Sequence, residues 1–592
     1  MKLTWDLKVL AKDEKEFLKI IKELEGILPK SEQFLKTLSP TMSTKDFKEL
    51  IDFSEKTKEK IRKIGAYLGL LSSEDTKSQK VMQLQPKIEQ LSIKLADKSR
   101  PISHWIKGLE VEGKKPLDNK NAERLFKTLP DHYYSLMYSR KLAKHNLSQE
   151  VEKIIHRKDI NGVDAITEVY DKVTTNFLYK FKVKGKEKVF DNQEELRKYT
   201  YSPKKEERKA AYDALFETYE NNKETLFTLY AAIVKDWDQE RELRKYKSAI
   251  NMRNLSNSFE DPVIETMLNT CKKNKTIYQE FFKLKAEMLG MKKLARTDLL
   301  APFEKKQKKY TFEETKKMVF DVFNTFHKDF ATKSEILFKE NHIDSHPRPS
   351  KRTGAFCMSV NSTIAPYVML NFTETRRDIS TMAHELGHAI HDLYSQELPL
   401  SVSHAPIPLC ETASTFAEML LFEELLKNSN KQEKIILLAE KIGDSYATII
   451  RQAYFVDFEI QAHKAIPQGL SEEQLSDMYF KNLKEQFGDS IDLPKNFRYE
   501  WSYIPHIFHT PFYCYAYSFG DLLSLALYAQ YKKQGKSFIP KLEIILKAGG
   551  SQDPVKLLNK EGFDITTEQF WQSGFDVVKS WLKELKKLNH SS

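Results

Sequence analysis

Long stretches of this chain carry apolar residues three and four positions apart, which is the spacing of an amphipathic helix. The pattern is clear over residues 14–100, resumes near residue 120, and returns over 202–246. Only 19 of the 592 residues are glycine, whereas Lys, Glu and Leu, which favour helix, are abundant. Residues 176–192 instead alternate apolar and polar side chains around KGKE, which predicts a β-hairpin. The sequence therefore predicts a mainly α fold with one or two small strand pairs.

Charge and composition argue against several classes of protein. The net charge is +11, but the basic residues are interleaved with acidic ones, as in EKTKEKIRK (55–63), which is typical of a solvated helix face. We therefore expect no nucleic-acid partner. No stretch approaches the ~18 apolar residues of a membrane span. The N-terminal sequence, MKLTWDLKVLAKDE, is charged where a signal peptide is apolar.

These features predict a cytoplasmic protein with no membrane partner, and they leave the oligomeric state open. The cysteines are far apart in the sequence and form no CxxC pair, so we expect reduced thiols and neither a disulfide framework nor a cysteine-rich zinc site. The four are Cys271, Cys357, Cys410 and Cys514.

The stretch TMAHELGHAI (381–390) carries the strongest functional signal. His384 and His388 are four residues apart, so on a helix their imidazoles stack on one face and can hold one Zn²⁺. Glu385 lies about 100° round the same helix, beside the metal, where a carboxylate can take a proton from a water molecule.

The residues before this motif predict that it lies within a helix. Thr375 and Asp378 form the S/T-x-x-D/E signal of a helix start. Apolar residues then recur at helical spacing and would anchor the helix in the core. They are Ile379, Met382, Leu386, Ile390 and Leu393.

A catalytic zinc usually has three protein ligands and one open position. A metzincin would place glycine and histidine at the positions of His391 and Tyr394, so that class is excluded. A second helical pattern begins near residue 409 and carries Glu411 and Glu418 two turns apart on one face. Glu411 is the best candidate for the third ligand. Glu418 fits the role of orienting a ligand imidazole, with an ordinary surface glutamate as the alternative.

With these motifs in place, the chain resembles the oligoendopeptidase F and thimet oligopeptidase family of zinc metallopeptidases, most closely the oligoendopeptidase F branch. The resemblance is carried by HELGHAIH (384–391), ETASTFAE (411–418) and YIPHIFHTPFYCYAYSFGDLL (503–523). The run GAFCMSVN…PYVMLNF (354–372) also resembles the family's lead-in to the first motif.

The resemblance implies one Zn²⁺ per chain, with His384, His388 and Glu411 as ligands and Glu385 as general base and acid. It implies an elongated, two-lobed, mainly helical body, with a deep and narrow substrate channel between the lobes. A small β-hairpin or sheet is expected near the active site. Such a channel admits unfolded oligopeptides and excludes folded proteins.

The third motif is expected to stabilise the negative charge that develops on the carbonyl oxygen during peptide hydrolysis. The resemblance implies that His506 and a tyrosine hydroxyl group donate hydrogen bonds to this oxygen. Tyr513 and Tyr515 both lie in the family's aromatic run, and we favour these two over Tyr517.

Several assignments around the motifs stay open. Relatives often carry tyrosine at the position of Phe508, which cannot donate a hydrogen bond, so the choice among the tyrosines is unresolved. His509 is an alternative to His506. His391 could support a ligand or contact substrate, and His404 could line the channel or be an ordinary loop histidine.

We predict a zinc metalloendopeptidase that cleaves internal bonds of short unfolded oligopeptides. One alternative is an end-trimming dipeptidase or carboxypeptidase, which would need a fixed charge such as Arg376, Arg377 or Arg498 to bind a chain terminus. The other is a non-catalytic peptide-binding relative, which would have no use for a general base.

Two expectations concern organisation. The chain is predicted to divide into an N-terminal helical lobe (1–200), with the hairpin near 177–191, and a catalytic domain (201–592). The apolar segment at 365–372 predicts a strand, which is the candidate edge for binding an extended substrate by backbone hydrogen bonds.

Overall fold

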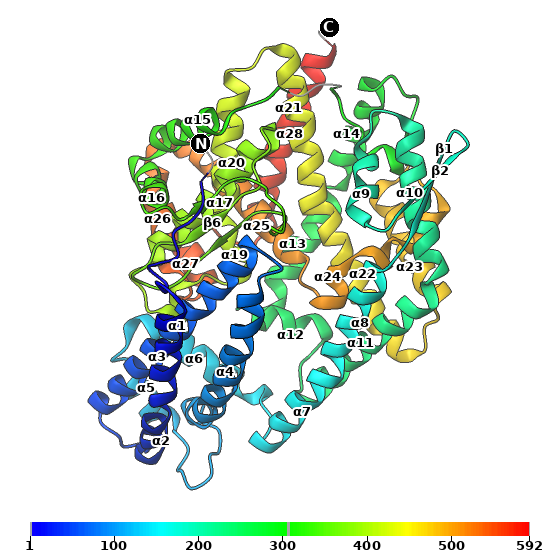
Figure 1. The fold of residues 1–592 in the computed structure, drawn as a ribbon. Helices are drawn as coiled ribbons and strands as arrows, with labels where there is room; N and C mark the ends of the chain where they lie inside the picture. The colour runs from blue at the N-terminus through cyan, green and yellow to red at the C-terminus, as the bar shows by residue number, and fades with distance from the viewer. Residues whose placement is uncertain (1–2, 305–307, 591–592) are drawn as a thin grey trace. The chain divides into compact units, whose positions relative to one another are not determined.

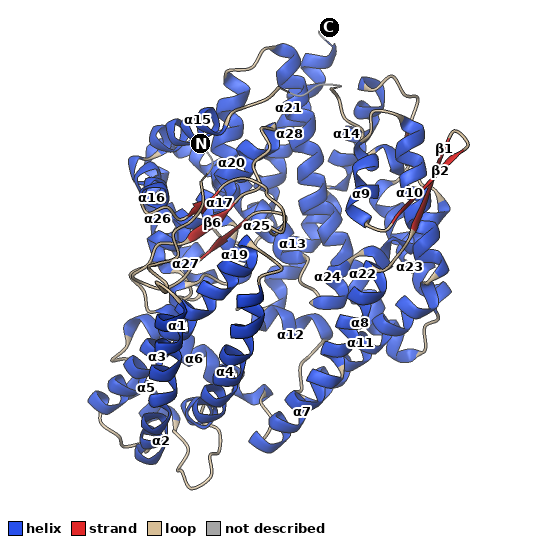
Figure 2. Cartoon of the chain, in the orientation of Figure 1, coloured by secondary structure: helices blue, strands red, loops and turns tan. Residues whose placement is uncertain are grey.

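The computed structural model describes residues 3–304 and 308–590, and helices dominate it (Figure 1). Figure 2 shows how few of the described residues lie in strands. The mainly α fold predicted from the sequence is confirmed. The elongated two-lobed shape and the deep channel stay predictions.

Contacts within the chain define two compact units, each assembled from three segments. Unit 1 comprises 1–144, 308–424 and 530–563, and unit 2 comprises 145–307, 425–529 and 564–592. The predicted division into a helical lobe (1–200) and a catalytic domain (201–592) stays a prediction. The two units are defined by contacts in the folded chain, which do not test which parts fold independently.

Unit 1 contains the first helices of the chain and those around the HELGH motif. They are α1 (Glu14–Gly26), α2 (Leu28–Thr37), α3 (Thr44–Glu74), α4 (Gln79–Ile106), α5 (Asn119–Phe126), α6 (Pro130–Leu142), α15 (Phe312–Phe326), α16 (Lys328–Lys339), α17 (Arg376–Ser395), α18 (Leu400–Ser403), α19 (Ile407–Cys410), α20 (Thr412–Lys427, to residue 424), α26 (Ile539–Ala548) and α27 (Pro554–Lys560).

Unit 2 contains the central helices and the aromatic motif. They are α7 (Gln149–Asn161), α8 (Val163–Thr175), α9 (Gln193–Arg197), α10 (Lys205–Asn221), α11 (Lys223–Leu243), α12 (Ala249–Ser256), α13 (Asp261–Lys273), α14 (Lys275–Met288), α21 (Lys431–Ser445), α22 (Arg451–Ala465), α23 (Glu472–Phe487), α24 (Pro505–His509), α25 (Tyr515–Gln534, to residue 529) and α28 (Glu568–His590).

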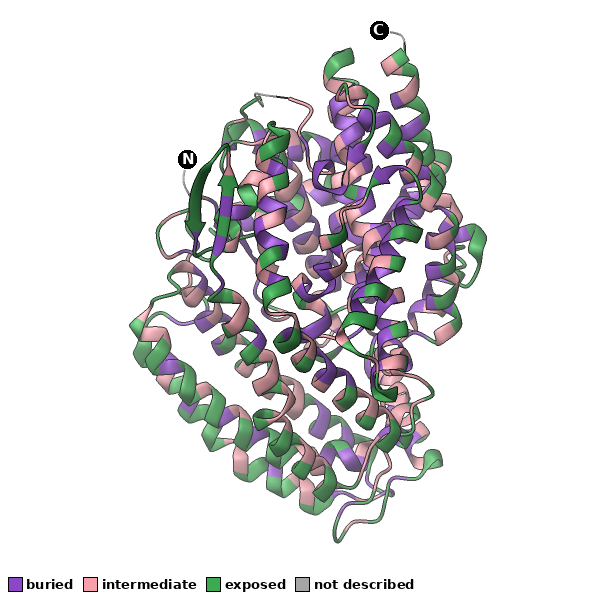
Figure 3. Cartoon of the chain, turned by 90° about the vertical axis from the view of Figure 1, so that its right-hand side faces the viewer, coloured by how far each residue is buried: buried purple, intermediate pink, exposed green. Residues whose placement is uncertain are grey.

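Amphipathic periodicity explains how these helices pack. Figure 3 shows buried residues along one side of many helices and exposed residues along the other, as expected for helices that bury one apolar stripe. None of the helices within the described residues is long and apolar enough to cross a membrane. All four cysteines are free thiols, as predicted.

The predicted hairpin is confirmed in unit 2. Strands β1 (Tyr179–Val183) and β2 (Lys186–Phe190) pair antiparallel. Lys184 and Gly185 form the turn with φ of 51° and 76°. Positive φ at both central residues is typical of a two-residue hairpin turn whose twist matches that of the strands. A second pair in this unit, β3 (Leu294–Ala295) and β7 (Ile491–Asp492), is parallel.

The sheet that supports the HELGH helix lies in unit 1 and has the strand order β4-β6-β5. Strand β6 (Tyr367–Met369) pairs parallel with β4 (Ile343–Asp344) and antiparallel with β5 (Phe356–Met358). The expectation that the strand near 365–372 offers an edge to substrate is therefore wrong. Both sides of β6 are already hydrogen-bonded, and β5 is the edge strand that lies against α17.

Candidate active site

Helix α17 begins as the sequence predicted. The side chain of Thr375 accepts a hydrogen bond from the backbone N–H of Asp378, and an Asp378 carboxylate oxygen accepts one from the Thr375 N–H at 2.8 Å. This capping box satisfies two N–H groups that a helix start leaves free. The predicted apolar residues are all buried at 9% exposure or less, and they fix which face of α17 points into the core.

The two motif histidines lie on another face of α17, one turn apart. Their Nε2 atoms are 3.2 Å from each other. Glu411 lies between α19 and α20, and its Oε2 atom is 3.4 Å from Nε2 of His384 and 3.3 Å from Nε2 of His388. The three side chains predicted as ligands are thus brought together as a nearly equilateral triangle of donor atoms.

This triangle fits a zinc ion. Zinc binds nitrogen and oxygen ligands at about 2.0–2.1 Å with tetrahedral angles, which places neighbouring ligand atoms about 3.3–3.4 Å apart. The observed separations of 3.2, 3.4 and 3.3 Å match that requirement. Three protein ligands leave a fourth position for water or substrate, which is the composition of a catalytic rather than a structural site.

A second set of ligand types, formed by His327, Asp329 and Glu543, also clusters in unit 1. Lys333 lies 3.5 Å from the Asp329 carboxylate and Lys547 lies 3.3 Å from that of Glu543. Because each carboxylate already has a lysine partner, this cluster attracts a cation less than the triangle around His384 does.

Glu418 lies on α20 and hydrogen-bonds the first ligand histidine. Its Oε1 atom is 2.7 Å from Nδ1 of His384. A carboxylate at Nδ1 holds the proton on that nitrogen and leaves Nε2 free to bind a metal. The alternative of an ordinary surface glutamate is wrong for Glu418.

Glu411 is held as a carboxylate. Ser414 donates a hydrogen bond to its Oε2 at 2.8 Å. Burial raises the pKa of the Glu411 carboxyl, but the hydrogen bond and charge of His388 and the charge of His384 outweigh burial and bring the pKa to about 2. The Glu411 side chain is therefore ionised at any pH near neutrality.

Glu385 lies beside the triangle and is buried, with 6% exposure. Burial is the main cause that raises the pKa of its carboxyl, and the neighbouring imidazoles of His384 and His388 oppose it. A carboxyl group whose pKa is shifted toward neutrality is suited to accept a proton and return it.

Gly387 allows α17 and α20 to approach closely. A Cβ atom at this position would lie 2.6 Å from the Cα of Ser414 and 2.7 Å from the carbonyl oxygen of Ala413. Any larger residue would push apart the two segments that carry the ligand set.

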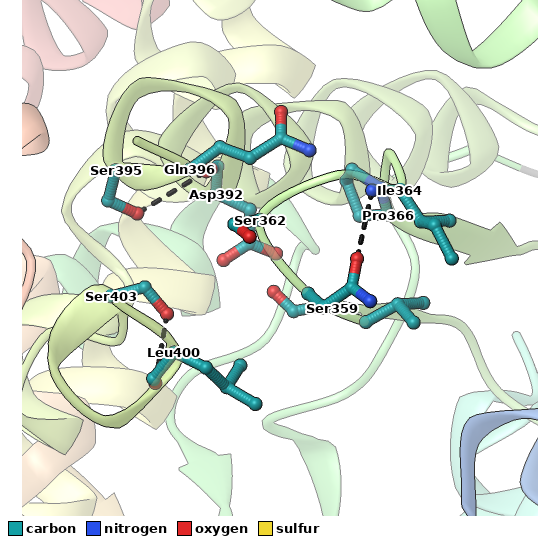
Figure 4. A pocket seen from close by; sticks show the side chains of 11 residues that line it. Ser359, Ser362, Ile364, Pro366, Asp392, Ser395, Gln396, Leu400 and Ser403 are labelled. Carbon is teal, nitrogen blue, oxygen red and sulfur yellow. Dashed lines mark hydrogen bonds between the residues drawn. The ribbon is translucent and has the colours of Figure 1, made fainter. Parts of the chain in front are cut away.

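A pocket of about 570 Å³ contains the three ligand side chains and Glu385, and all of its walls belong to unit 1. Its other lining residues come from three places: the edge strand β5 with its flanks, the C-terminal half of α17, and the loop around His404. Arg62 of α3 also lines it. A smaller polar pocket shares Ser359, Asp392, Ser395 and Ser403 with it (Figure 4).

His391 and His404, whose roles the sequence does not decide, both line the larger pocket. His391 is buried, and burial lowers its pKa to about 4, so it is neutral. His404 lies 3.9 Å from a carboxylate oxygen of Asp392. Two charged lining residues, Arg62 and Asp392, have no local motif in the sequence that marks them as part of a site.

The aromatic motif belongs to unit 2. Nε2 of His506 is 3.4 Å from the Tyr517 hydroxyl group, and its ring is parallel to that of Tyr513 with centroids 6.2 Å apart. Tyr515 is fully buried, and its hydroxyl group accepts a hydrogen bond from Asn257 at 2.7 Å.

His509 and Phe508, which lie close to His506 in the sequence, make other contacts in this unit. Nε2 of His509 is 2.8 Å from Asp171. Phe508 is buried and stacks on Tyr170 with centroids 3.8 Å apart, so this position packs the core. Burial lowers the pKa of His506, which keeps its imidazole neutral.

Comparison with known proteins identifies the family of this chain. The sequence pattern of Peptidase family M3 matches residues 198–577. The chain is 26% identical to an oligoendopeptidase F homolog of Lactococcus lactis subsp. lactis, over 99% of this chain and 97% of that protein. It is 28% identical to an oligoendopeptidase F homolog of Borreliella burgdorferi, over 99% of this chain and 98% of that protein.

Solved structures share the fold. One from Chlamydophila abortus has a TM-score of 0.86 at 24% identity and covers 99% of this chain and 98% of its own. The oligoendopeptidase-F of Enterococcus faecium has a TM-score of 0.73 at 21% identity and covers 98% of this chain and 100% of its own. The family match spans more than half of the chain and contains both the HELGH motif and Glu411. The chain therefore belongs to Peptidase family M3, the oligoendopeptidase F type, and is a metallo-oligopeptidase.

Proposed function

We propose that this protein is a zinc-dependent endopeptidase that hydrolyses internal peptide bonds of short, unfolded oligopeptides. The observation that carries the proposal is the triangle of donor atoms from His384, His388 and Glu411, with the carboxyl group of Glu385 beside it. The likeness to oligoendopeptidase F proteins over 99% of the chain supports it. Cytoplasmic location, where reduced thiols persist, is part of the proposal.

Two imidazoles and one carboxylate form a donor set that suits zinc. When bound, one zinc ion per chain would supply Lewis acidity that acidifies a water molecule and polarises the scissile carbonyl group. Glu385 would accept a proton from the water molecule while the oxygen of that water bonds to the carbonyl carbon. The same carboxyl group would give that proton to the amine nitrogen as the C–N bond breaks.

His506 and tyrosine hydroxyl groups of the aromatic motif are proposed to donate hydrogen bonds to the carbonyl oxygen as its negative charge develops. We propose Tyr513 and Tyr517 for this role in place of Tyr515, because both rings lie against His506, whereas the hydroxyl group of Tyr515 is buried against Asn257.

Substrate is proposed to bind in extended form along β5. This strand pairs with β6 on one side only, and its residues line the pocket that holds the ligand side chains. An extended peptide can hydrogen-bond to the free side of such a strand whatever its side chains are, which suits an enzyme that accepts many sequences.

The end-trimming alternative needs a fixed positive charge in the pocket, and the three arginines that the sequence offers for it do not lie there. Neither Arg376 nor Arg377 is among the residues that line the pocket. Arg498 lies in unit 2 and forms an ion pair of 2.6 Å with Asp477.

The test is hydrolysis of a peptide of about ten residues, acetylated and amidated at its ends, with the products identified by mass spectrometry. Internal cleavage of the blocked peptide supports an endopeptidase. Release of terminal residues only from the unblocked version would favour the end-trimming alternative. Absence of any cleavage by zinc-loaded protein would favour the peptide-binding alternative.

A further inference from the structure

Arg62 is a cationic side chain in the pocket that holds the ligand set. It lies on α3, more than 300 residues before the HELGH motif in the sequence. Among the described residues that line this pocket, it alone carries a permanent positive charge. It lies close enough to His404 for its charge to add to burial in lowering the pKa of that imidazole, against Asp392, which raises it.

The Arg62 guanidinium group is fixed at one end and open at the other. Its Nε donates a hydrogen bond to the backbone carbonyl oxygen of Ser359 at 3.2 Å. No carboxylate within the described part of the chain lies within 4.0 Å of its nitrogen atoms. The two Nη groups are thus available for a bidentate contact, the geometry in which arginine binds carboxylates.

The position of Arg62 relates it to a bound peptide. Ser359 directly follows the edge strand β5, so the guanidinium group lies at the end of the strand along which substrate is proposed to extend. The same loop is tied to α3 a second time, because Ser362 donates a hydrogen bond to Glu59 at 3.0 Å. The loop that accepts the Arg62 hydrogen bond is therefore itself fixed to α3, beside the proposed path of the peptide.

We propose that Arg62 is a specificity-determining residue that binds a carboxylate of the substrate. The carboxylate belongs either to an acidic side chain near the cleaved bond or to the C-terminus of a short peptide. This inference rests on the proposed peptidase function. It is distinct from the chemical step, because Arg62 would bind substrate and not the reacting atoms.

The test measures binding, so that it does not depend on turnover. Zinc-loaded Glu385→Gln protein is titrated with fluorescent peptides in matched pairs: glutamate against glutamine at each position in turn, and free against amidated C-terminus. We expect one pair to differ by about tenfold in Kd, the magnitude of a charge-assisted hydrogen-bonded contact. Whether a side-chain pair or the C-terminal pair differs identifies the source of the carboxylate.

Three variants in the same background separate recognition from structure. Arg62→Gln is expected to reduce the tenfold preference to about one. Lys63→Gln removes the same charge from α3 outside the pocket and should leave the preference intact. Ser362→Ala removes the second hydrogen bond between this loop and α3 without changing any charge, and it should weaken both members of a pair equally.

Two results would overturn the proposal: a Kd ratio near one for every pair, or a preference that survives Arg62→Gln. An equal loss of affinity for both members of each pair in Arg62→Gln, matching the loss in Ser362→Ala, would likewise show that Arg62 only holds the loop. Failure of the proposed function is a separate result, namely absence of peptide cleavage by wild-type protein.

Discussion

The Nδ1 atom of His384 and the Oε1 atom of Glu418 lie 2.7 Å apart, although 34 residues separate them in the sequence. This contact fixes the orientation of the His384 imidazole and keeps a proton on its Nδ1 atom, so that Nε2 is the nitrogen left to bind a metal. It also joins α17, which carries both histidines, to α20, the helix that directly follows Glu411.

Replacing Glu418 with glutamine should weaken zinc binding by about 10- to 100-fold, because the amide holds the His384 tautomer less firmly than the carboxylate does. Competition with a chelator of known affinity measures the change. The control is Glu423→Gln, on the same helix but paired with Lys532, which should bind zinc as wild type does. Equal affinity in wild type and Glu418→Gln would contradict the assigned role.

Replacing Gly387 with alanine should separate α17 from α20, because the new Cβ would lie 2.6 Å from the Cα of Ser414. We expect a loss of about 1–3 kcal/mol in the free energy of unfolding and a lower zinc affinity. Gly65→Ala on α3 is a matched control, since nothing lies within 4 Å of a Cβ added there. Thermal unfolding and metal content measure the two effects. A Gly387→Ala protein as stable as wild type would show that the helices can separate freely.

Zinc binding should release protons. Burial lowers the pKa of His384 in the metal-free protein, but the hydrogen bond and charge of Glu418 and the charges of Glu411 and Glu385 outweigh burial and raise the pKa to about 9. At neutral pH the imidazole therefore carries a proton that must leave before Nε2 binds a metal.

We consequently expect zinc affinity to increase with pH up to about 9, with about one proton released from His384 per ion at pH 7. Glu411, whose pKa is about 2, should contribute none. Calorimetry in buffers of different ionisation enthalpy counts the released protons. In Glu418→Gln the release at pH 8 should be smaller, and an unchanged value would rule out Glu418 as the source of the raised pKa.

A buried ion pair stabilises the segment that leads to the site. The side chains of Lys351 and Asp344 are both fully buried with 2.8 Å between their charged atoms, and Lys351 also donates to the carbonyl oxygen of Leu370 at 2.6 Å. Lys351→Met should lower the free energy of unfolding by about 3 kcal/mol, because these acceptors lose their donor. Urea unfolding measures the change, and Lys339→Met, an exposed pair on α16, should alter it by less than about 1 kcal/mol.

Much of the site could be predicted because its signals are local. The capping residues Thr375 and Asp378, the spacing of His384 and His388, and the apolar stripe of α17 all lie within 20 residues of one another. Such patterns are set by the geometry of a single helix. Glu411 lies at the start of the next helical pattern in the sequence. The family motif ETASTFAE also implies that it is a ligand.

Features that depend on distant parts of the chain could not be predicted. Strand β6 is central because β4 and β5 pair with it, and two- and three-residue strands leave little trace in a sequence. Arg62 lies in a charged run that reads as a solvated helix face, and only folding brings it to the pocket. The orientation of Tyr515 depends on where α25 begins, which the aromatic run does not mark.

Glu385 is central to the proposed mechanism, as the proton carrier beside a bound zinc ion. The decisive measurement compares wild type with Glu385→Gln on one blocked fluorogenic peptide, with the zinc content of both proteins determined in parallel. We predict one zinc per chain in each protein, internal cleavage by wild type, and a loss of turnover of at least about 100-fold in the variant. A variant that holds zinc and still cleaves at the wild-type rate would contradict the account, as would a wild-type protein that binds no zinc when it is supplied.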